Sequence, residues 1–293
     1  FCGSEDPATQ LLKHLKDKKA LFVLDNFEQL LAGADFVAEI LRAAPDVKII
    51  ATTRERLNLS EEWLFEVDGL KVPSSLSLAA VGSAEWVENY SAVKLFLQSA
   101  RRVRLGLAFS AEDKIFVAQL CSLVDGMPLA LELAAAWSRT LSCADIFLQV
   151  TQDLDFLVTS QRDLPERHRS MRAVFESSWK RLSEQERDAL NHLTVFQEGF
   201  QLKAAQEICG ASIPLLSALV DKSMLHVSTS GRYKMHELLR QYIAEKVSDV
   251  EHTQDRDRHC RFYAGFLSQC FKDLSTGRIK QTLDEISTEF ENV

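Results

Sequence analysis

The stretch that decides the fold is Ala20-Leu21-Phe22-Val23-Leu24-Asp25. Its apolar part is a short unbroken run, which is typical of a strand buried on both faces of a parallel sheet. Asp25 follows at the carboxyl end of that strand, and open α/β sheets bind their ligands at this edge. The stretch therefore predicts a buried parallel strand with a carboxylate at the ligand-binding edge.

Asp25 has two interpretations. A carboxylate at a strand end can hold Mg²⁺, usually through water, beside nucleotide phosphates, which is the arrangement of a Walker B strand. Aspartate is also a common turn residue, so the same pattern fits a strand that ends in an ordinary turn. The stretch by itself does not decide between the two.

A helix and further strands follow this stretch. Residues 27–44 carry apolar side chains at helical spacing. Residues 47–53 form a second β-rich run that leads into Arg54, and residues 64–67 predict a short third strand. Strand, helix and strand at this spacing make a βαβ unit with a parallel sheet. We therefore predict an α/β fold for residues 1–82.

The rest of the chain is predicted to be mainly α-helical. Residues 83–160 indicate a helical domain that is interrupted by the turn Gly126-Met127-Pro128. Residues 161–250 contain several helices, one of them opened by a predicted capping box at Ser183-Glu184-Gln185-Glu186. A hairpin signal follows at Thr229-Ser230-Gly231, and together these features predict a winged helix-turn-helix domain. Residues 251–293 predict the start of a further helical region.

Composition limits the class of protein. The chain has 293 residues and a net charge of −8, so bulk basicity does not indicate nucleic-acid binding. No apolar run approaches the length of a membrane span, and no signal-peptide pattern is present at the beginning. The six cysteines form no C-x-x-C pair and are expected to be reduced thiols of a cytoplasmic protein. Because the chain begins at Phe1 instead of methionine, we expect a segment of a longer protein.

Three further residues are candidates for binding a nucleotide, and each has a plainer alternative. Arg54, at a strand exit, offers a rigid fork of donors to a γ-phosphate, but surface arginines at strand ends are common. Pro128 could pack on an adenine ring or could simply begin a helix. His236 could donate to a phosphate or could be a helix cap. No G-x-x-x-x-G-K-[ST] phosphate loop occurs in the chain.

The order of four weak motifs is more specific than any one of them. They are LFVLDNFEQLL (21–31), IIATTRERL (49–57), GMPLALELAAAW (126–137) and YKMHELLRQY (233–242). In this order they resemble the STAND class of signalling NTPases, and in particular the NB-ARC-type module of large bacterial LuxR-type and SARP-type transcriptional regulators. The resemblance implies that residues 1–82 are the C-terminal part of a P-loop NTPase domain, with the phosphate loop upstream of Phe1. It also implies that residues 251–293 begin a tetratricopeptide-like region.

The resemblance assigns a role to each candidate. Asp25 would be a magnesium ligand and a catalytic residue, and Arg54 a catalytic sensor of the γ-phosphate. Pro128 would pack on adenine, and His236 would contact the β-phosphate of ADP. The implied cofactors are ATP or ADP with Mg²⁺. Asn26 departs from the family, because many members carry a second acid there, and the catalytic base is therefore left unassigned. Glu28 is a possible substitute, but its position is a poor match.

A second departure lies beside His236. Glu237 stands where the family usually has aspartate.

The function implied by the resemblance is a nucleotide-dependent switch in a bacterial signal-transducing regulator. ADP would hold the winged helix closed, and exchange for ATP would permit self-association and release an effector or DNA-binding domain elsewhere in the longer chain. Hydrolysis would be slow, and this segment alone would be inactive. Two alternatives stay open: a winged-helix DNA-binding regulator, and a scaffold that no longer hydrolyses nucleotide, which Asn26 favours.

The resemblance also makes a prediction about strand order. In related P-loop folds, the strand that carries the phosphate loop lies between the strand that ends at the γ-phosphate sensor and the strand that follows it. Residues 20–25 and 48–53 should therefore pair directly and in parallel. Residues 64–67 should not be hydrogen-bonded beside residues 48–53.

Overall fold

The structure is a computed structural model that describes residues 5–73, 86–159, 165, 168–197, 199–275 and 279–293. It divides into two compact units. The first consists of Phe1–Val67 with Leu219–Ser223, and the second of Asp68–Ala218 with Met224–Val293. Each unit is described by itself below.

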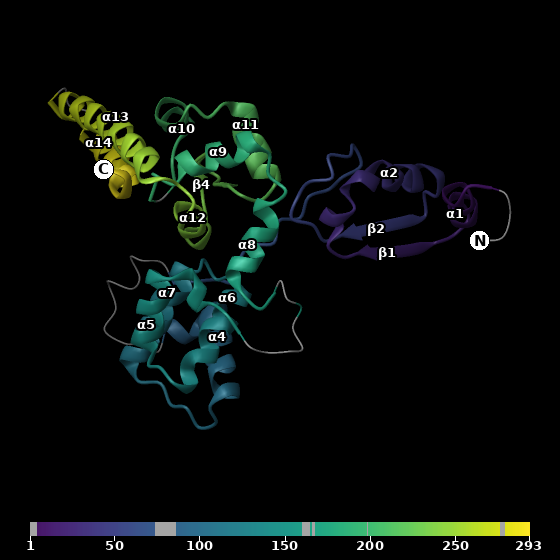
Figure 1. Ribbon diagram of the computed structural model, residues 1–293, viewed down its shortest axis with the longest axis horizontal. Coiled ribbons are helices and arrows are strands. Elements are labelled where there is room, and N and C mark those ends of the chain that lie inside the picture. Colours follow the sequence, from purple (N-terminus) through teal and green to yellow (C-terminus); the bar gives the residue numbers. More distant parts are fainter. Residues whose placement is uncertain (1–4, 74–85, 160–164, 166–167, 198, 276–278) are drawn as a thin grey trace. The chain divides into compact units, whose positions relative to one another are not determined.

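The first unit is a small parallel α/β layer (Figure 1). Its elements are α1 (Pro7–Leu15), β1 (Ala20–Leu24), two short 3₁₀ turns, α2 (Ala34–Ala43) and β2 (Val47–Ala51). β1 and β2 pair in parallel from Ala20↔Val47 to Leu24↔Ala51, as the sequence predicted. The helix predicted from residue 27 begins only at Ala34, because the 3₁₀ turns Phe27–Gln29 and Leu31–Gly33 precede it.

Helices cover one face of the strand pair. Val47 and Ala44 pack with Phe22 and Ile49, and a second cluster forms around Phe27. The opposite face carries exposed apolar side chains, since Leu21, Val23 and Ile50 are 59%, 65% and 54% exposed. The prediction that β1 is buried on both faces is therefore wrong for this unit, because an apolar run does not reveal how many layers cover it.

The predicted third strand is also absent. Residues 64–67 form no strand among the described residues, and Trp63, Phe65 and Val67 are 96%, 89% and 85% exposed. Aromatic and β-branched composition gives a segment strand propensity, but a strand needs a hydrogen-bonded neighbour and a surface to pack on. Within the described residues β2 pairs with β1, so the prediction that residues 64–67 do not pair beside β2 is confirmed.

The second unit begins with a helical bundle, labelled α4 to α7 in Figure 1. α4 packs against α6, and α5 against α7. The bundle buries large apolar side chains completely, among them Phe96, Leu120 and Leu131. Each such side chain stabilises the fold by about 1.5–3 kcal/mol. The elements are η3 (Trp86–Asn89), α4 (Ser91–Val103), α5 (Ala111–Leu123), α6 (Pro128–Ala136), η4 (Trp137–Arg139), α7 (Cys143–Gln152) and η5 (Leu154–Phe156).

A second group of helices carries the predicted hairpin. β3 and β4 pair antiparallel, with His226↔Lys234 and Val227↔Tyr233 in register, and Phe200 forms a further antiparallel bridge to Tyr233. The capping box predicted at Ser183 is present at the start of α9, because Ser183 and Glu186 cap each other's backbone N–H groups. The elements are α8 (Met171–Trp179), α9 (Glu184–Leu193), α10 (Leu202–Cys209), α11 (Ile213–Asp221), β3 (His226–Val227), β4 (Tyr233–Lys234) and α12 (Glu237–Ala244).

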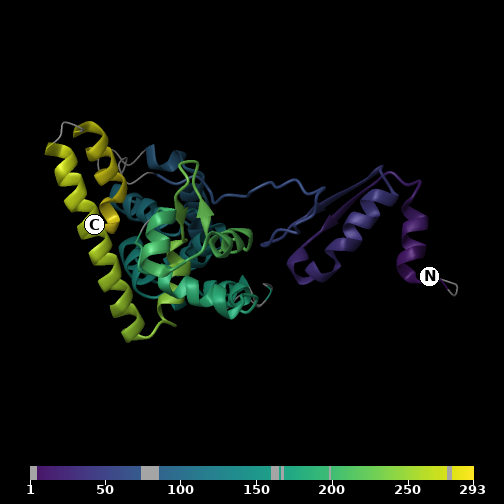
Figure 2. The ribbon, with the colours of Figure 1, turned by 90° about the horizontal axis from the view of Figure 1, so that it is seen from above.

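The chain closes with a helical pair that lies side by side in Figure 2. α13 (Asp249–Ser275) and α14 (Ile279–Glu289) are followed by a 3₁₀ turn, Phe290–Asn292. The Tyr263 hydroxyl donates to Glu289 Oε2 at 3.0 Å, and Arg232 of the hairpin forms an ion pair with the same carboxylate. The last helices are therefore joined to the hairpin through a nearly buried charge pair. None of the described helices is long and apolar enough to cross a lipid bilayer.

Candidate functional site

Asp25 lies at the carboxyl end of β1, where parallel pairing continues past the strand. Thr52 N donates to Leu24 O at 2.9 Å, and Phe27 N donates to Thr52 O at 2.9 Å. These bonds place Thr52 beside Asp25, and the Thr52 hydroxyl donates to Asp25 Oδ1. Asn26, with φ of 55°, donates its side-chain amide to Asp25 Oδ2 at 3.2 Å. Neutral donors thus orient an exposed carboxylate at this edge of the sheet.

The donor set at this edge fits Mg²⁺ only in part. Among the described residues, no group of three or more acidic, histidine or cysteine side chains is placed to hold a metal ion. Mg²⁺ is commonly held by one or two carboxylates, with water and substrate phosphates filling the other positions. Asp25 could therefore contribute to Mg²⁺ binding only together with a phosphate ligand.

Arg54 lies just beyond β2 and faces Glu28, a buried acid that the sequence did not place beside it. Arg54 Nε is 3.9 Å from Glu28 Oε1, and the Glu28 side chain is only 6% exposed. Glu28 Oε2 is buried and has no hydrogen-bond partner in the described structure. The sequence could have indicated this pairing, because the carboxyl ends of parallel strands meet at one edge.

Pro128 is the first residue of α6 and lies directly after a tight turn. Asp125 and Gly126 have φ of 45° and 65°, and the Pro128 side chain is exposed. An exposed ring at this position could contact a flat ligand. It also serves the plainer role of starting the helix, since proline is favoured at the first helical position.

Backbone from residues 69–70 seals one side of this turn. Leu70 N donates to Gly126 O at 2.9 Å. A Cβ atom on Gly126 would lie 2.0 Å from Leu70 O, and one on Gly69 would lie 2.1 Å from Asp125 O. Only glycine at both positions permits this approach of the two backbones.

His236 contacts the same turn from the other side. It caps α12, because Nδ1 accepts from Leu238 N at 3.1 Å. Nδ1 is therefore the acceptor, and Nε2 carries the proton that it donates to Val124 O at 3.1 Å. Both ring nitrogens are thus used, and the hydrogen bonds fix one neutral tautomer.

The surroundings of His236 keep it neutral. Burial lowers its pKa, while Asp125, 3.8 Å from Nε2, and the Val124 carbonyl oppose that shift. Lys234 adds to the lowering, and its ammonium is 3.4 Å from Asp125. The structure therefore brings His236 against the turn before Pro128, a contact between segments that no local sequence signal predicts.

The four residues predicted from the sequence thus lie at two places, with two residues at each. Asp25 and Arg54 follow the paired strands of the first unit, and Pro128 and His236 lie at or beside the turn in the second. The sequence did not identify Thr52, Glu28, Leu70 or Val124 as their partners.

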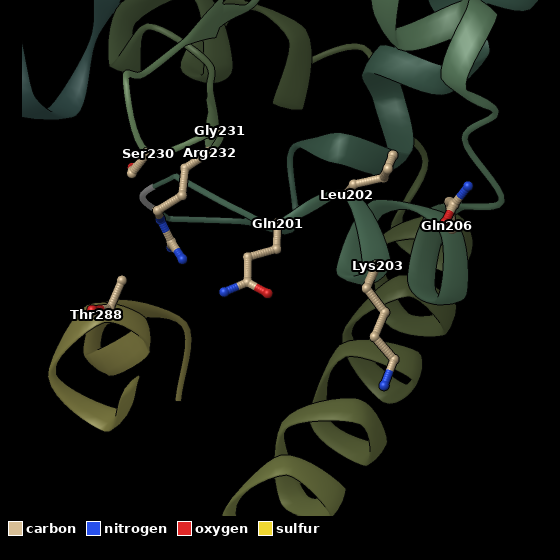
Figure 3. Close-up of a pocket in the computed structure, with 8 residues that line it drawn as sticks. All are labelled: Gln201, Leu202, Lys203, Gln206, Ser230, Gly231, Arg232 and Thr288. Carbon is tan, nitrogen blue, oxygen red and sulfur yellow. The ribbon is translucent and has the colours of Figure 1, made fainter. Parts of the chain in front are cut away.

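A cavity lies elsewhere in the second unit. It has a volume of about 520 Å³ and lies between the start of α10, the hairpin turn and the end of α14 (Figure 3). Gln201 extends from the start of α10, and Arg232 and Thr288 line the cavity from the hairpin and from α14. None of the four predicted residues lines it.

Comparison with known proteins gives distant relatives. No family model matches the sequence. A candidate HTH-type transcriptional regulator of Mycobacterium tuberculosis is 30% identical over 269 residues, covering 88% of this chain and 29% of the relative. An uncharacterized protein of the same species is 31% identical over 248 residues, covering 80% of this chain and 59% of that protein. The chain thus spans less than two thirds of the length of both relatives.

One solved structure aligns along most of the chain. It is a STAND protein, a signal transduction ATPase with numerous domains, with a tetratricopeptide repeat sensor, from Pyrococcus horikoshii. The identity is 17%, and the alignment covers 97% of this chain and 38% of that one. The TM-score of 0.29 is too low to establish a common fold.

Proposed function

We propose that this chain is part of an ATP- and ADP-dependent switch in a bacterial signal-transducing transcriptional regulator. The 30% identity to a candidate HTH-type regulator supports the regulatory part of the proposal. The nucleotide part is supported by the order of the four sequence motifs and by the placement of their key residues at a strand edge and at a sealed turn.

The observation that carries the switch is the hydrogen bond from His236 to Val124. A neutral imidazole has one N–H donor, and here that donor is used by the carbonyl of the turn before Pro128. A phosphate oxygen would compete for the same donor, and hydrogen bonds to charged acceptors are about twice as strong as neutral ones. His236 therefore has two alternative acceptors, and the β-phosphate of ADP would select one of them.

The strand edge of the first unit is the proposed place for Mg²⁺ and the γ-phosphate. Asp25 would hold Mg²⁺ together with nucleotide phosphates, and Mg²⁺ would neutralise phosphate charge there. Arg54 would turn its guanidinium to the γ-phosphate and distinguish ATP from ADP. In the full-length protein, release of the ADP-bound closed state would permit self-association and expose an effector or DNA-binding domain.

Hydrolysis is the least supported part of this function. Asn26, not an acid, follows Asp25, and its amide donates to the Asp25 carboxylate. This arrangement favours a second candidate, a nucleotide-binding scaffold that does not hydrolyse ATP. Glu28 is the other carboxylate near Arg54. If hydrolysis occurs, Glu28 is our candidate for the water-activating base.

The test is ADP retention by the full-length protein and its His236→Ala variant. Loss of one charge-assisted hydrogen bond should accelerate ADP release about tenfold. His14→Ala is the matched control, because His14 is an exposed histidine on α1, and its ADP release should stay within about twofold of the parent, as expected of a surface substitution. Unchanged ADP retention in His236→Ala would remove His236 from the switch.

A second comparison separates the switch from the scaffold. Asp25→Ala should abolish magnesium-dependent nucleotide exchange and any hydrolysis. If the parent protein binds ATP with no measurable turnover, the scaffold is the better description.

A further inference from the structure

A second cavity opens at the surface of the helical bundle, away from the residues discussed above. Its volume is about 290 Å³. Arg104 follows the end of α4, Asp113 belongs to the first turn of α5, and Arg139 lies in η4. Cys143 is the first residue of α7. Four separate elements thus place polar groups around one small space.

Two arginines give the cavity its positive charge. Arg104 and Arg139 are exposed, and neither forms an ion pair in the described part of the chain. The chain has a net charge of −8, so the positive charge at this cavity differs in sign from the chain as a whole. Guanidinium groups present a rigid fork of donors that matches the oxygens of phosphate and carboxylate.

A buried hydroxyl lines the same cavity. Ser138 is 3% exposed, and its Oγ has no hydrogen-bond partner in the described structure. A buried hydroxyl without a partner costs free energy, so such groups in folded proteins call for a specific explanation. The oxygen has almost no accessible surface, so a ligand oxygen in the cavity would become its partner only if the lining moved slightly.

The start of α7 adds backbone donors. This helix has ten residues, and Ser142 caps it by accepting from Asp145 N at 3.1 Å. Among the described residues, the backbone N–H of Cys143 has no hydrogen-bond acceptor. The first N–H groups of a helix and its dipole both favour a negative group at this end.

Two acids near the start of α7 counteract this preference for a negative group, and both carboxylates already accept hydrogen bonds. The Asp113 carboxylate accepts from Ser110 N and from the Ser110 hydroxyl at 2.9 and 2.8 Å. It also accepts the Cys143 thiol, whose pKa is raised to about 12 by burial and by Asp113, so that the thiol stays neutral. Asp145 accepts the Ser142 hydroxyl at 2.6 Å and does not line the cavity. The lining therefore carries two positive charges and one negative charge.

We propose that this cavity binds a small phosphate group, either free phosphate or the phosphate of a small ester. Donors come from Arg104 after α4, from Ser138 and Arg139 of η4, and from the start of α7. A tetrahedral group with three or four oxygens can meet several donors at once, whereas a planar carboxylate offers only two oxygens. This site is independent of the nucleotide site proposed above.

The experiment is a titration of the purified chain with inorganic phosphate at constant ionic strength, in which isothermal calorimetry measures the binding. The parent chain should bind phosphate saturably. Arg104→Gln and Arg139→Gln should each weaken the affinity about tenfold, which corresponds to one charge-assisted hydrogen bond. Arg102→Gln is the matched control. Arg102 is exposed near the end of α4, two residues before Arg104, and does not line the cavity. Its affinity should stay within about twofold, since distant exposed charges are screened.

Ser138→Ala separates a ligand contact from a structural one. Since Ser138 Oγ has no partner, its removal should leave the thermal midpoint of the ligand-free chain unchanged or slightly raised, while the affinity for phosphate falls. Acetate at the same ionic strength should bind at least tenfold more weakly than phosphate, and glycerol phosphate should compete with phosphate. The proposal is overturned if phosphate shows no saturable binding, if acetate binds equally well, or if Arg102→Gln weakens binding as much as Arg139→Gln.

Discussion

The turn before Pro128 and the strand end at Asp25 differ in how accessible their candidate ligand-binding side chains are. The turn is closed: the backbone of Leu70 lies against Gly126, and His236, whose side chain is 15% exposed, donates to the Val124 carbonyl. The strand end is open: Asp25 is exposed, and the ion pair between Arg54 and Glu28 is 3.9 Å long.

This difference separates two energetic roles. A ligand at the turn must break buried hydrogen bonds before His236 can reach it, and such bonds contribute about 0.5–1.5 kcal/mol each, with a further penalty for any partner left without a bond. A ligand at the strand end can reach Asp25 without such a step. We therefore expect the turn to set the threshold of a switch and the strand end to supply ligand affinity.

The largest expected effect is that of Gly126→Ala on the closed turn. A Cβ atom would lie 2.0 Å from Leu70 O, at a residue with φ of 65°, so the backbone of residues 69–70 would have to move. Urea denaturation followed by tryptophan fluorescence should show a loss of about 3 kcal/mol or more, because strain and a lost hydrogen bond combine.

Gly210→Ala is the control for that loss. Gly210 has φ of 67°, but nothing lies within 4 Å of its Cβ position. Gly210→Ala should lower the free energy of unfolding by only about 1 kcal/mol, because only the left-handed backbone conformation disfavours alanine there. Equal losses in the two variants would mean that residues 69–70 do not seal the turn.

The next effect concerns the two bonds of His236. His236→Ala removes the cap of α12 and leaves the Val124 carbonyl without its donor, so we expect a loss of about 2 kcal/mol in the free energy of unfolding. His236→Asn should lose about half as much, since asparagine is a good helix cap but is too short to replace the imidazole at Val124. If both variants lose the same amount, the contact with the turn contributes little.

A pH titration sharpens the comparison further. Burial lowers the folded-state pKa of His236, so near pH 6.5 the unfolded chain binds a proton that the folded chain does not. Stability should therefore fall as pH decreases from about 6.5 toward the folded-state pKa, by at most about 1.4 kcal/mol per pH unit for one group. Urea denaturation at a series of pH values measures this slope.

His259 also contributes to the dependence of stability on pH, because burial lowers its pKa as well. His236→Asn should therefore remove one part of the pH dependence and leave the part of His259. A slope that is identical in the parent and in His236→Asn would show that His236 is accessible to protons in the folded chain.

The sequence predicted the parallel pair β1 and β2, because a βαβ spacing has few alternatives. It also predicted the hairpin at Thr229-Ser230-Gly231 and the capping box at Ser183, which depend on local turn and cap chemistry. It failed for residues 64–67, since strand formation there depends on a neighbour and not on propensity.

The candidate site was predictable to a smaller extent. Asp25 and Arg54 follow strands, so their shared edge could be inferred from topology. The contact of His236 with Val124 joins residues that are 112 positions apart, and nothing in either segment encodes it. The buried position of Glu28 was also not predictable, because charged residues are rarely buried and spacing alone does not identify an exception.

The smallest expected effect is at the open strand end. Glu28 is 6% exposed, one of its oxygens has no partner, and its ion pair with Arg54 is 3.9 Å long. Burying a charge costs free energy that a long ion pair does not fully offset, so the neutral isostere in Glu28→Gln should leave the first unit equally stable or up to about 1 kcal/mol more stable. Hydrogen exchange of the β1 and β2 amides measures this, since those amides report opening of the first unit itself.

Glu39→Gln on α2 is the control, because Glu39 is exposed and its substitution should change stability by less than about 0.5 kcal/mol. A loss of more than about 2 kcal/mol in Glu28→Gln would show that the Glu28–Arg54 pair is a strong structural contact. Arg54 would then have to give up that contact before it could reach a phosphate, and the strand end would no longer be the more accessible of the two regions. A neutral or stabilising effect instead leaves Arg54 able to exchange Glu28 for a phosphate at little cost.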